Sequence, residues 1–129
     1  MHKVTNVFIV SPVMQKAIGG AVAVAAGMSH SLVLGQDGSV WASGKNMQGQ
    51  LGDGAMISKT IFMPVIPSGV HSVTAGAWHS MAVSKNGSVW ATGANDYGQL
   101  GDGSQVNKKS FVRVVPASDG ARCMIFLLH

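Results

Sequence analysis

Residues 49–54, Gly-Gln-Leu-Gly-Asp-Gly, return unchanged at residues 98–103, and this block decides the fold. Shifting the sequence by 49 residues aligns 24–67 with 73–116 without a gap, and 22 of the 44 aligned pairs are identical. Unrelated segments of ordinary composition would share about 3. The chain therefore contains a tandem duplication. A repeat period of about 20 to 50 residues is typical of propellers and solenoids.

Each copy is expected to form four short β-strands. In the first copy we expect strands at 22–26, 31–34 and 40–43, and a fourth that ends near Pro67. Asp37-Gly38 lies between the second and third strands, and Asn86-Gly87 replaces it in the second copy. Both dipeptides accept the positive φ angles of a type I′ hairpin turn. Since four antiparallel strands make one propeller blade, the predicted fold is all-β: two four-stranded antiparallel blades of an incomplete β-propeller.

The duplication also divides the chain. The predicted parts are a lead-in segment at 1–21, a first repeat at 22–69, a second repeat at 70–118, and the start of a third repeat at 119–129 that breaks off. The period predicts Val/Ile-x-Ala-Gly around 122–125, where the sequence is Arg-Cys-Met-Ile. We expect a fragment, a truncated product, or a subunit that must assemble.

Composition agrees with a β fold and constrains the partners. There are 17 Gly among 129 residues and the acidic residues are all Asp, which disfavours helices. The formal charge of +4 permits contact with nucleic acid, but the basic residues are scattered apart from Lys108, Lys109 and Arg113. The single Cys123 favours a reducing compartment. No segment reaches the roughly 18 apolar residues of a membrane helix. These features predict an intracellular protein, cytoplasmic or nuclear, with no membrane partner.

Signatures of catalysis, cofactors and metals are missing from the sequence. Residues 38–46 are similar to a phosphate loop, but the spacing is wrong and no Ser or Thr follows Lys45. There is no Gly-x-Ser-x-Gly elbow, and the His and Cys residues lack metal-ligand spacing. We therefore expect no enzymatic activity, no cofactor and no bound metal.

Three motifs recur in both copies with the same spacing: Ala-Gly-x-x-His-Ser, Asp/Asn-Gly-Ser-Val-Trp-Ala and Gly-x-Asn-x-x-Gly-Gln-Leu-Gly-Asp-Gly. Through them the chain resembles the regulator of chromosome condensation repeat over about residues 22–116. The resemblance implies two blades of a seven-bladed propeller that binds other proteins on one face. It also implies two alternative functions, guanine-nucleotide exchange on a small GTPase such as Ran, and docking on chromatin or nucleic acid.

The residues expected to bind a partner lie in loops. By resemblance, His30 and His79 match loop positions that face the GTPase, although a structural hydrogen bond at a strand start explains them too. Met28 lies in the same loop as His30, and no acidic residue stands in either loop, which argues against exchange activity. The other expected binding residues are Met47 and Tyr97, in tips that differ between the copies, and Trp78, whose counterpart is Ser29. The leading hypothesis is a protein-interaction module.

Other repeated residues are expected to be structural. They are Gly27, Gly76, Trp41, Trp90, Gly52, Gly54, Gly101 and Gly103. Two blades share one interface and leave two apolar faces uncovered, so the chain is expected to self-associate. Five consecutive apolar residues at 124–128 add a further apolar patch. Truncation before Arg122 is expected to improve solubility without loss of β structure.

Overall fold

The computed structural model describes residues 19–117, and all regular structure in that range is β-strand. The strands are β1 (Ala21–Ala26), β2 (His30–Gly35), β3 (Val40–Gly44), β4 (Lys59–Ile66), β5 (Val70–Ala75), β6 (His79–Ser84), β7 (Val89–Gly93) and β8 (Lys108–Val115). They form two antiparallel sheets, β1-β2-β3-β4 and β5-β6-β7-β8. The expected fold of two four-stranded blades is confirmed. The predicted start of a third repeat and the apolar stretch 124–128 lie outside the described residues.

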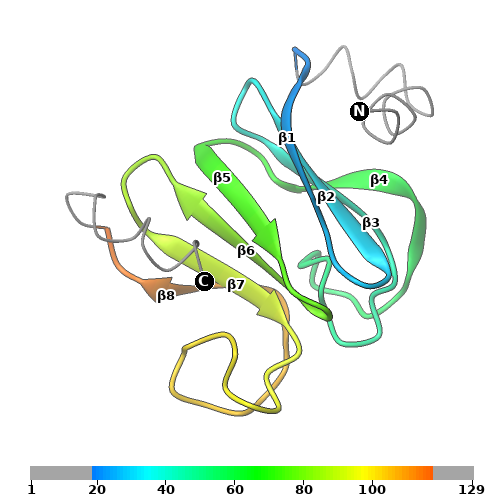
Figure 1. Ribbon diagram of the computed structural model, residues 1–129, viewed down its shortest axis with the longest axis vertical. Helices are drawn as coiled ribbons and strands as arrows, with labels where there is room; N and C mark the ends of the chain where they lie inside the picture. The colour runs from blue at the N-terminus through cyan, green and yellow to red at the C-terminus, as the bar shows by residue number, and fades with distance from the viewer. Residues whose placement is uncertain (1–18, 118–129) are drawn as a thin grey trace.

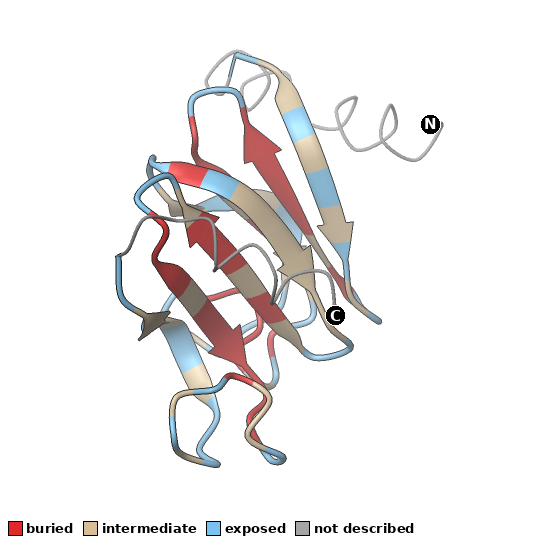
Figure 2. Ribbon diagram, turned by 60° about the vertical axis from the view of Figure 1, so that its left-hand side comes forward, coloured by how far each residue is buried: buried red, intermediate tan, exposed pale blue. Residues whose placement is uncertain are grey.

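The two blades pack face to face through their first strands, with β5 beside β1 and β2 (Figure 1). One apolar cluster joins them: Leu32, Leu34 and Leu51 of the first blade pack with Val70 and Ala82 of the second. Burial is concentrated in the central strands of each sheet (Figure 2). The shared interface is thus the main core of the molecule, because a single sheet cannot bury its apolar face alone.

Each blade has a second apolar face, formed by the strand residues whose side chains point away from the shared interface. Val33, between Leu32 and Leu34, packs instead with Trp41 and Phe62. In the second blade, Val83 and Val89 form a separate cluster. Side chains of a strand alternate between the two faces of a sheet, so only one face of each blade takes part in the shared interface.

The hairpin turn between β2 and β3 differs from the predicted type I′ turn. That turn requires positive φ at two residues, but only Gly38 (φ +83°) has one and Asp37 does not. The Gly38 N–H donates to the Gly35 carbonyl at 2.9 Å, so the chain forms an ordinary turn followed by a left-handed glycine. The role of Asp37 in this turn is performed by its side chain, whose Oδ1 accepts the Ser39 N–H at 3.0 Å. In the second copy, the Asn86 Oδ1 accepts the Ser88 N–H in the same way. Both residues supply one acceptor oxygen, which explains their exchange.

In the described part of the chain, no helix has the length and apolar character needed to cross a membrane.

Candidate functional site

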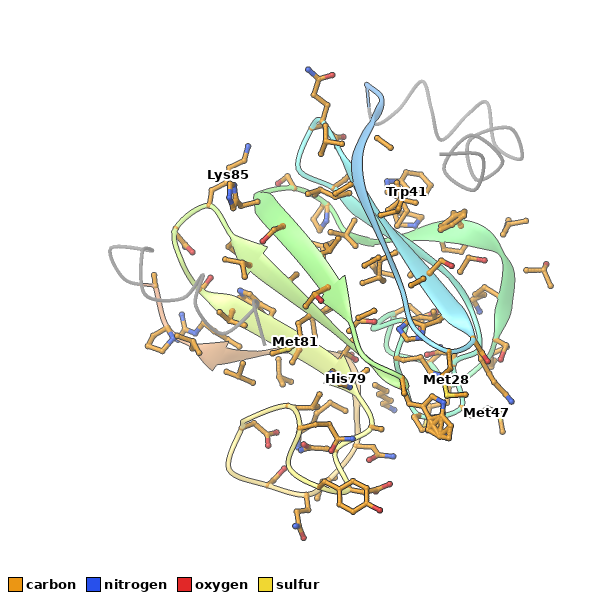
Figure 3. All side chains as sticks on the ribbon, in the orientation of Figure 1. Met28, Trp41, Met47, His79, Met81 and Lys85 are labelled. Atoms are coloured by element: carbon orange, nitrogen blue, oxygen red, sulfur yellow. The ribbon has the colours of Figure 1, made fainter. Side chains whose placement is uncertain are left out.

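A groove opens at one end of the blade interface, where three loops converge. Its lining residues are Met28 and Ser29 of the β1–β2 loop, Lys45, Met47 and Gln48 of the β3–β4 loop, and Trp78 of the β5–β6 loop, around a volume of about 420 Å³. Figure 3 shows Met28 and Met47 side by side at this end of the molecule. In an antiparallel meander the first and third connections emerge at the same end of the sheet, which brings these loops together.

Backbone hydrogen bonds hold the walls of the groove in place. The Met28 N–H donates to the Ala77 carbonyl at 3.1 Å and joins the two blades. The Lys45 N–H donates to the Ser29 carbonyl at 2.8 Å and ties the β3–β4 loop to the β1–β2 loop. The groove therefore belongs to the folded frame and needs no rearrangement of the described backbone to exist.

The groove combines apolar side chains with one cation. Met28, Met47 and Trp78 are 72%, 58% and 42% exposed, which is high for large apolar residues. Methionine is flexible and polarizable, and tryptophan is the residue most enriched at interface hot spots. Lys45 adds an exposed positive charge at the same rim. Such a lining suits an apolar side chain of a partner with an acidic group nearby.

The other predicted binding residues lie elsewhere. Tyr97, on the β7–β8 loop, is 90% exposed and does not line the groove. His79, which Figure 3 labels, lies at the start of β6 and is half-buried. His30 is only 3% exposed, so the expected contact of this ring with a partner does not agree with its position inside the protein. The groove unites Met28, Met47 and Trp78, which are three of the six predicted residues.

His30 belongs to the contact between the blades. The Ser80 hydroxyl donates to the Gln50 carbonyl at 2.7 Å, so the His30 Nε2–H, 2.9 Å away, donates to Ser80. Burial lowers the pKa of His30, and the neighbouring His79 lowers it further. Burial also lowers the pKa of His79. Burial therefore disfavours the protonated form of both rings. His30 fits the structural alternative that the sequence left open.

The repeated glycines and tryptophans occupy packing positions. A Cβ at Gly27 or Gly76 would collide with the ring of His30 or His79, which explains the Gly-x-x-His motif. Trp90 lines a second, apolar cavity of about 270 Å³ between the blades, together with Ile66 and Phe111. Trp41 packs in the Val33 cluster of the first blade. The Trp41 and Trp90 indoles donate to Ser39 and Ser88, respectively.

Two structural residues were missed among the variable loop tips. Asn46 and Asn95 are completely buried. The Asn46 Nδ2 donates to the Asp53 carboxylate at 3.1 Å and to the Ala55 carbonyl at 3.0 Å, while its Oδ1 accepts the Leu51 N–H at 3.0 Å. Asn95 makes equivalent bonds. Their identity between copies, inside otherwise different tips, was the signal that could have revealed them.

The charged side chains beside these loops form local pairs. Lys108 lies 3.5 Å from Asp102. Hydrogen bonds from the Ser104 backbone and from Asn95, with the Lys108 charge nearby, hold the pKa of Asp102 at about 2. Lys109 and Arg113 are exposed on β8, an edge strand. Within residues 19–117, no group of three or more His, Cys, Asp or Glu side chains is placed to hold a metal ion.

Comparison with known proteins agrees with the duplication. Models of the regulator of chromosome condensation (RCC1) repeat match residues 21–50 and 70–99, and residues 37–83 and 86–122. The first set of matches begins at the first strand of each blade, whereas the second set begins in the turn between the second and third strands. A comparison with curated proteins gave no match.

Solved structures share the fold. A structure of Prp20p from Saccharomyces cerevisiae, studied with its binding to Gsp1p and histones, is 24% identical with a TM-score of 0.65. Human WBSCR16 is 22% identical with a TM-score of 0.69, and yeast RCC1 (Prp20) bound to Kap60 is 24% identical with a TM-score of 0.61. The matches cover 74%, 77% and 74% of this chain but only 26%, 27% and 25% of those chains. The chain therefore spans about a quarter of the length of these structures.

Proposed function

The chain belongs to the regulator of chromosome condensation repeat family, and from that premise we propose that it is a protein-interaction module whose groove binds an apolar side chain of a protein partner. The observation that carries this proposal is the convergence of Met28, Met47 and Trp78 in one groove across the blade interface. These residues come from three loops and stay exposed. A group of large apolar side chains that is exposed together marks an interaction surface.

The chemistry of the groove indicates the partner. A flexible methionine pair beside a rigid indole accommodates an aliphatic or aromatic side chain. Lys45 at the rim favours an acidic residue next to that side chain, and this charge pair would add selectivity rather than affinity. We therefore expect a segment of a protein partner in which an apolar residue is adjacent to Asp or Glu.

The test compares a groove variant with a matched control. In the groove variant, Met28, Met47 and Trp78 are replaced by Ala. In the control, Met56 and Met63 are replaced by Ala, since these methionines are also exposed on the first blade but do not line the groove. Both variants should keep the β-type circular dichroism spectrum and melt within a few degrees of the parent, because exposed substitutions change stability by about 0.5 kcal/mol.

Proteins retained on the immobilised parent chain are identified by mass spectrometry, and each is then titrated in purified form. The groove variant should bind at least about 30-fold more weakly than the parent, as expected for lost hot-spot residues, while the control binds normally. Equal affinity of a folded groove variant for every such partner would overturn the proposal.

Nucleotide exchange and nucleic-acid binding have less support from the side chains. The exposed loop positions at Met28, Ser29 and Trp78 carry no acidic group. Of the basic cluster, Lys108 is paired with Asp102, which leaves Lys109 and Arg113. Release of a fluorescent GDP analogue from a small GTPase, accelerated by the chain, would favour exchange. Affinity for DNA that falls steeply with salt would favour nucleic-acid binding.

A further inference from the structure

The loop at 49–54 clamps the first blade onto the second. The Thr92 hydroxyl donates to the Gly49 carbonyl at 2.7 Å, and the Ser80 hydroxyl donates to the Gln50 carbonyl at 2.7 Å. The Gly54 N–H donates to the Lys109 carbonyl at 2.8 Å. A Cβ at Gly52 would lie 2.5 Å from the Phe111 ring, so the backbone itself packs against that ring. We call residues 49–54 the engaged loop.

The loop at 98–103 has the same sequence and the same internal bonds, but it has no such contact among the described residues. A Cβ at Gly101 or Gly103 would meet no atom within 4 Å. Gly101 is exposed, whereas the equivalent Gly52 is buried. The loop projects beyond the end of β7 on the side of the second blade (Figure 1). Asn95 holds it in the same way as Asn46 holds the engaged loop. We call residues 98–103 the free loop.

The first blade carries a matching surface that is not used in the shared interface. The second blade contacts the engaged loop with Ser80, Thr92 and Phe111, and Val73 packs against the apolar cluster that includes Leu51. The residues at the same positions of the first blade are Val24, Ser31, Ser43 and Phe62. Each pair keeps the same chemistry: a valine, a serine, a hydroxyl and a phenylalanine. Val24 is 41% exposed, although its equivalent Val73 packs against the shared core.

We propose that the free loop of one copy docks on this face of the first blade in a second copy, which repeats between chains the contact that joins the two blades within a chain. Ser43 would donate to the Gly98 carbonyl, Ser31 would donate to the Gln99 carbonyl, and His79 would donate to Ser31. The contact is heterologous, because the two copies use different surfaces. Each copy in such a pair keeps one free loop and one receiving face, so the assembly can grow beyond two copies.

The free loop is tested with two glycine substitutions that the isolated chain should tolerate equally. Gly101→Asn and Gly103→Asn both place Asn, which accepts the left-handed conformation, at φ +75° and +85° in open space. In the docked loop they differ. The position of Gly52 abuts the Phe111 ring, whose equivalent on the receiving face is Phe62. A Cβ at Gly54 would lie 3.5 Å from the Ser110 hydroxyl, and the equivalent of Ser110 on the receiving face is the exposed Ile61. Gly101→Asn should therefore weaken association about tenfold or more, while Gly103→Asn weakens it much less.

The receiving face is tested with two valines of β1 that are both exposed. Val24→Asp places a charge where the equivalent Val73 is packed in the shared interface, so it should weaken association at least about 100-fold. Val22→Asp is the control, because the equivalent position in the second blade is His71, which stays exposed beside the first blade. Both variants lie on an edge strand and should fold, as circular dichroism would verify.

Sedimentation velocity over a range of concentrations measures the association. The parent, Gly103→Asn and Val22→Asp should associate reversibly. Gly101→Asn and Val24→Asp should stay monomeric at the concentrations where the parent associates, because their association is about tenfold and about 100-fold weaker, respectively. A mixture of the last two should form a dimer and nothing larger, because one supplies an intact receiving face and the other an intact free loop. A monomeric parent, equal behaviour of all four folded variants, or a mixture that fails to pair would each overturn the proposal.

Discussion

The engaged and free loops are identical in six residues and in their internal hydrogen bonds, yet they differ in what surrounds them. Gly52 is buried against Phe111, whereas Gly101 is exposed. The difference shows that the conformation of this loop is set locally, by Asn46 or Asn95 and by the glycines. Its contribution to stability is set by the neighbouring blade. Paired substitutions at equivalent positions therefore separate the two effects within one molecule.

The largest difference is expected between Gly52→Ala and Gly101→Ala. Both residues have a left-handed φ, of +77° and +75°, so each substitution should cost about 1–2 kcal/mol of unfolding free energy in backbone strain. Gly52→Ala also forces Cβ into the Phe111 ring, which should add about 1–3 kcal/mol. Urea denaturation at a concentration where the chain is monomeric measures both. Equal losses would show that the engaged loop is not held by the second blade.

Asn46→Ala and Asn95→Ala compare how much the internal structure of each loop contributes to the unfolding free energy. Each removes the buried amide that organises its own loop. Asn46→Ala should reduce the unfolding free energy by about 2–3 kcal/mol, because the clamp between the blades is loosened too. Asn95→Ala should cost about 1 kcal/mol and act locally. Hydrogen exchange would show faster exchange of the Leu100 amide alone in Asn95→Ala, and of both blades in Asn46→Ala. Global loosening by Asn95→Ala would contradict this assignment.

Ser80→Ala and Ser31→Ala compare a buried hydroxyl that forms hydrogen bonds between the blades with its equivalent on the receiving face. Ser80→Ala leaves the Gln50 carbonyl and the His30 ring without their partner and should cost about 1–2 kcal/mol. Ser31→Ala should change the unfolding free energy of the monomer by less than about 0.5 kcal/mol. Thermal melts of both variants and the parent measure the loss of stability. A larger loss for Ser31→Ala than for Ser80→Ala would contradict the prediction.

The smallest effect concerns pH. Burial lowers the pKa of His30 and of His79 below the ordinary 6.5. As the pH falls below about 6.5, the unfolded chain takes up protons at these rings while the folded chain does not, so stability falls with acidification. The melting temperature should therefore be lower at pH 5.5 than at pH 7.5. Replacing either ring, by His30→Gln or His79→Gln, should reduce this pH dependence. A melting temperature that rises toward pH 5.5 would contradict the predicted loss of stability on acidification.

The duplication made the fold predictable, because the positions that stay the same in both copies, and those exchanged for a similar residue, indicate where the backbone constrains the sequence. Exchange of Asp37 for Asn86 beside an unchanged glycine located the hairpin, although the turn type was wrong: the exchange reflects a shared side-chain acceptor rather than positive φ. Leu51, the leucine of the repeated loop, points inward and is 1% exposed. These features depend on residues close in sequence, whose conformational demands are visible without tertiary contacts.

The candidate site could be predicted only in part. Met28, Met47 and Trp78 were each expected to bind a partner, but sequence spacing does not show that they line one groove. His30 was expected at the surface by resemblance, and it is covered because the second blade supplies Ser80 next to it. Exposure of a residue at the end of a strand depends on which blade packs beside it, and that packing is a contact distant in sequence.

By itself the sequence determined the two repeats, their strands and the places of the turns, because backbone geometry and alternation of apolar residues act over a few positions. Only the tertiary structure decided which of two identical loops is engaged, which histidine is buried, and which exposed residues meet in a groove. The reason is physical: each of these outcomes is a contact between the two blades, and the free energy of such a contact depends on the partner surface as much as on the residue.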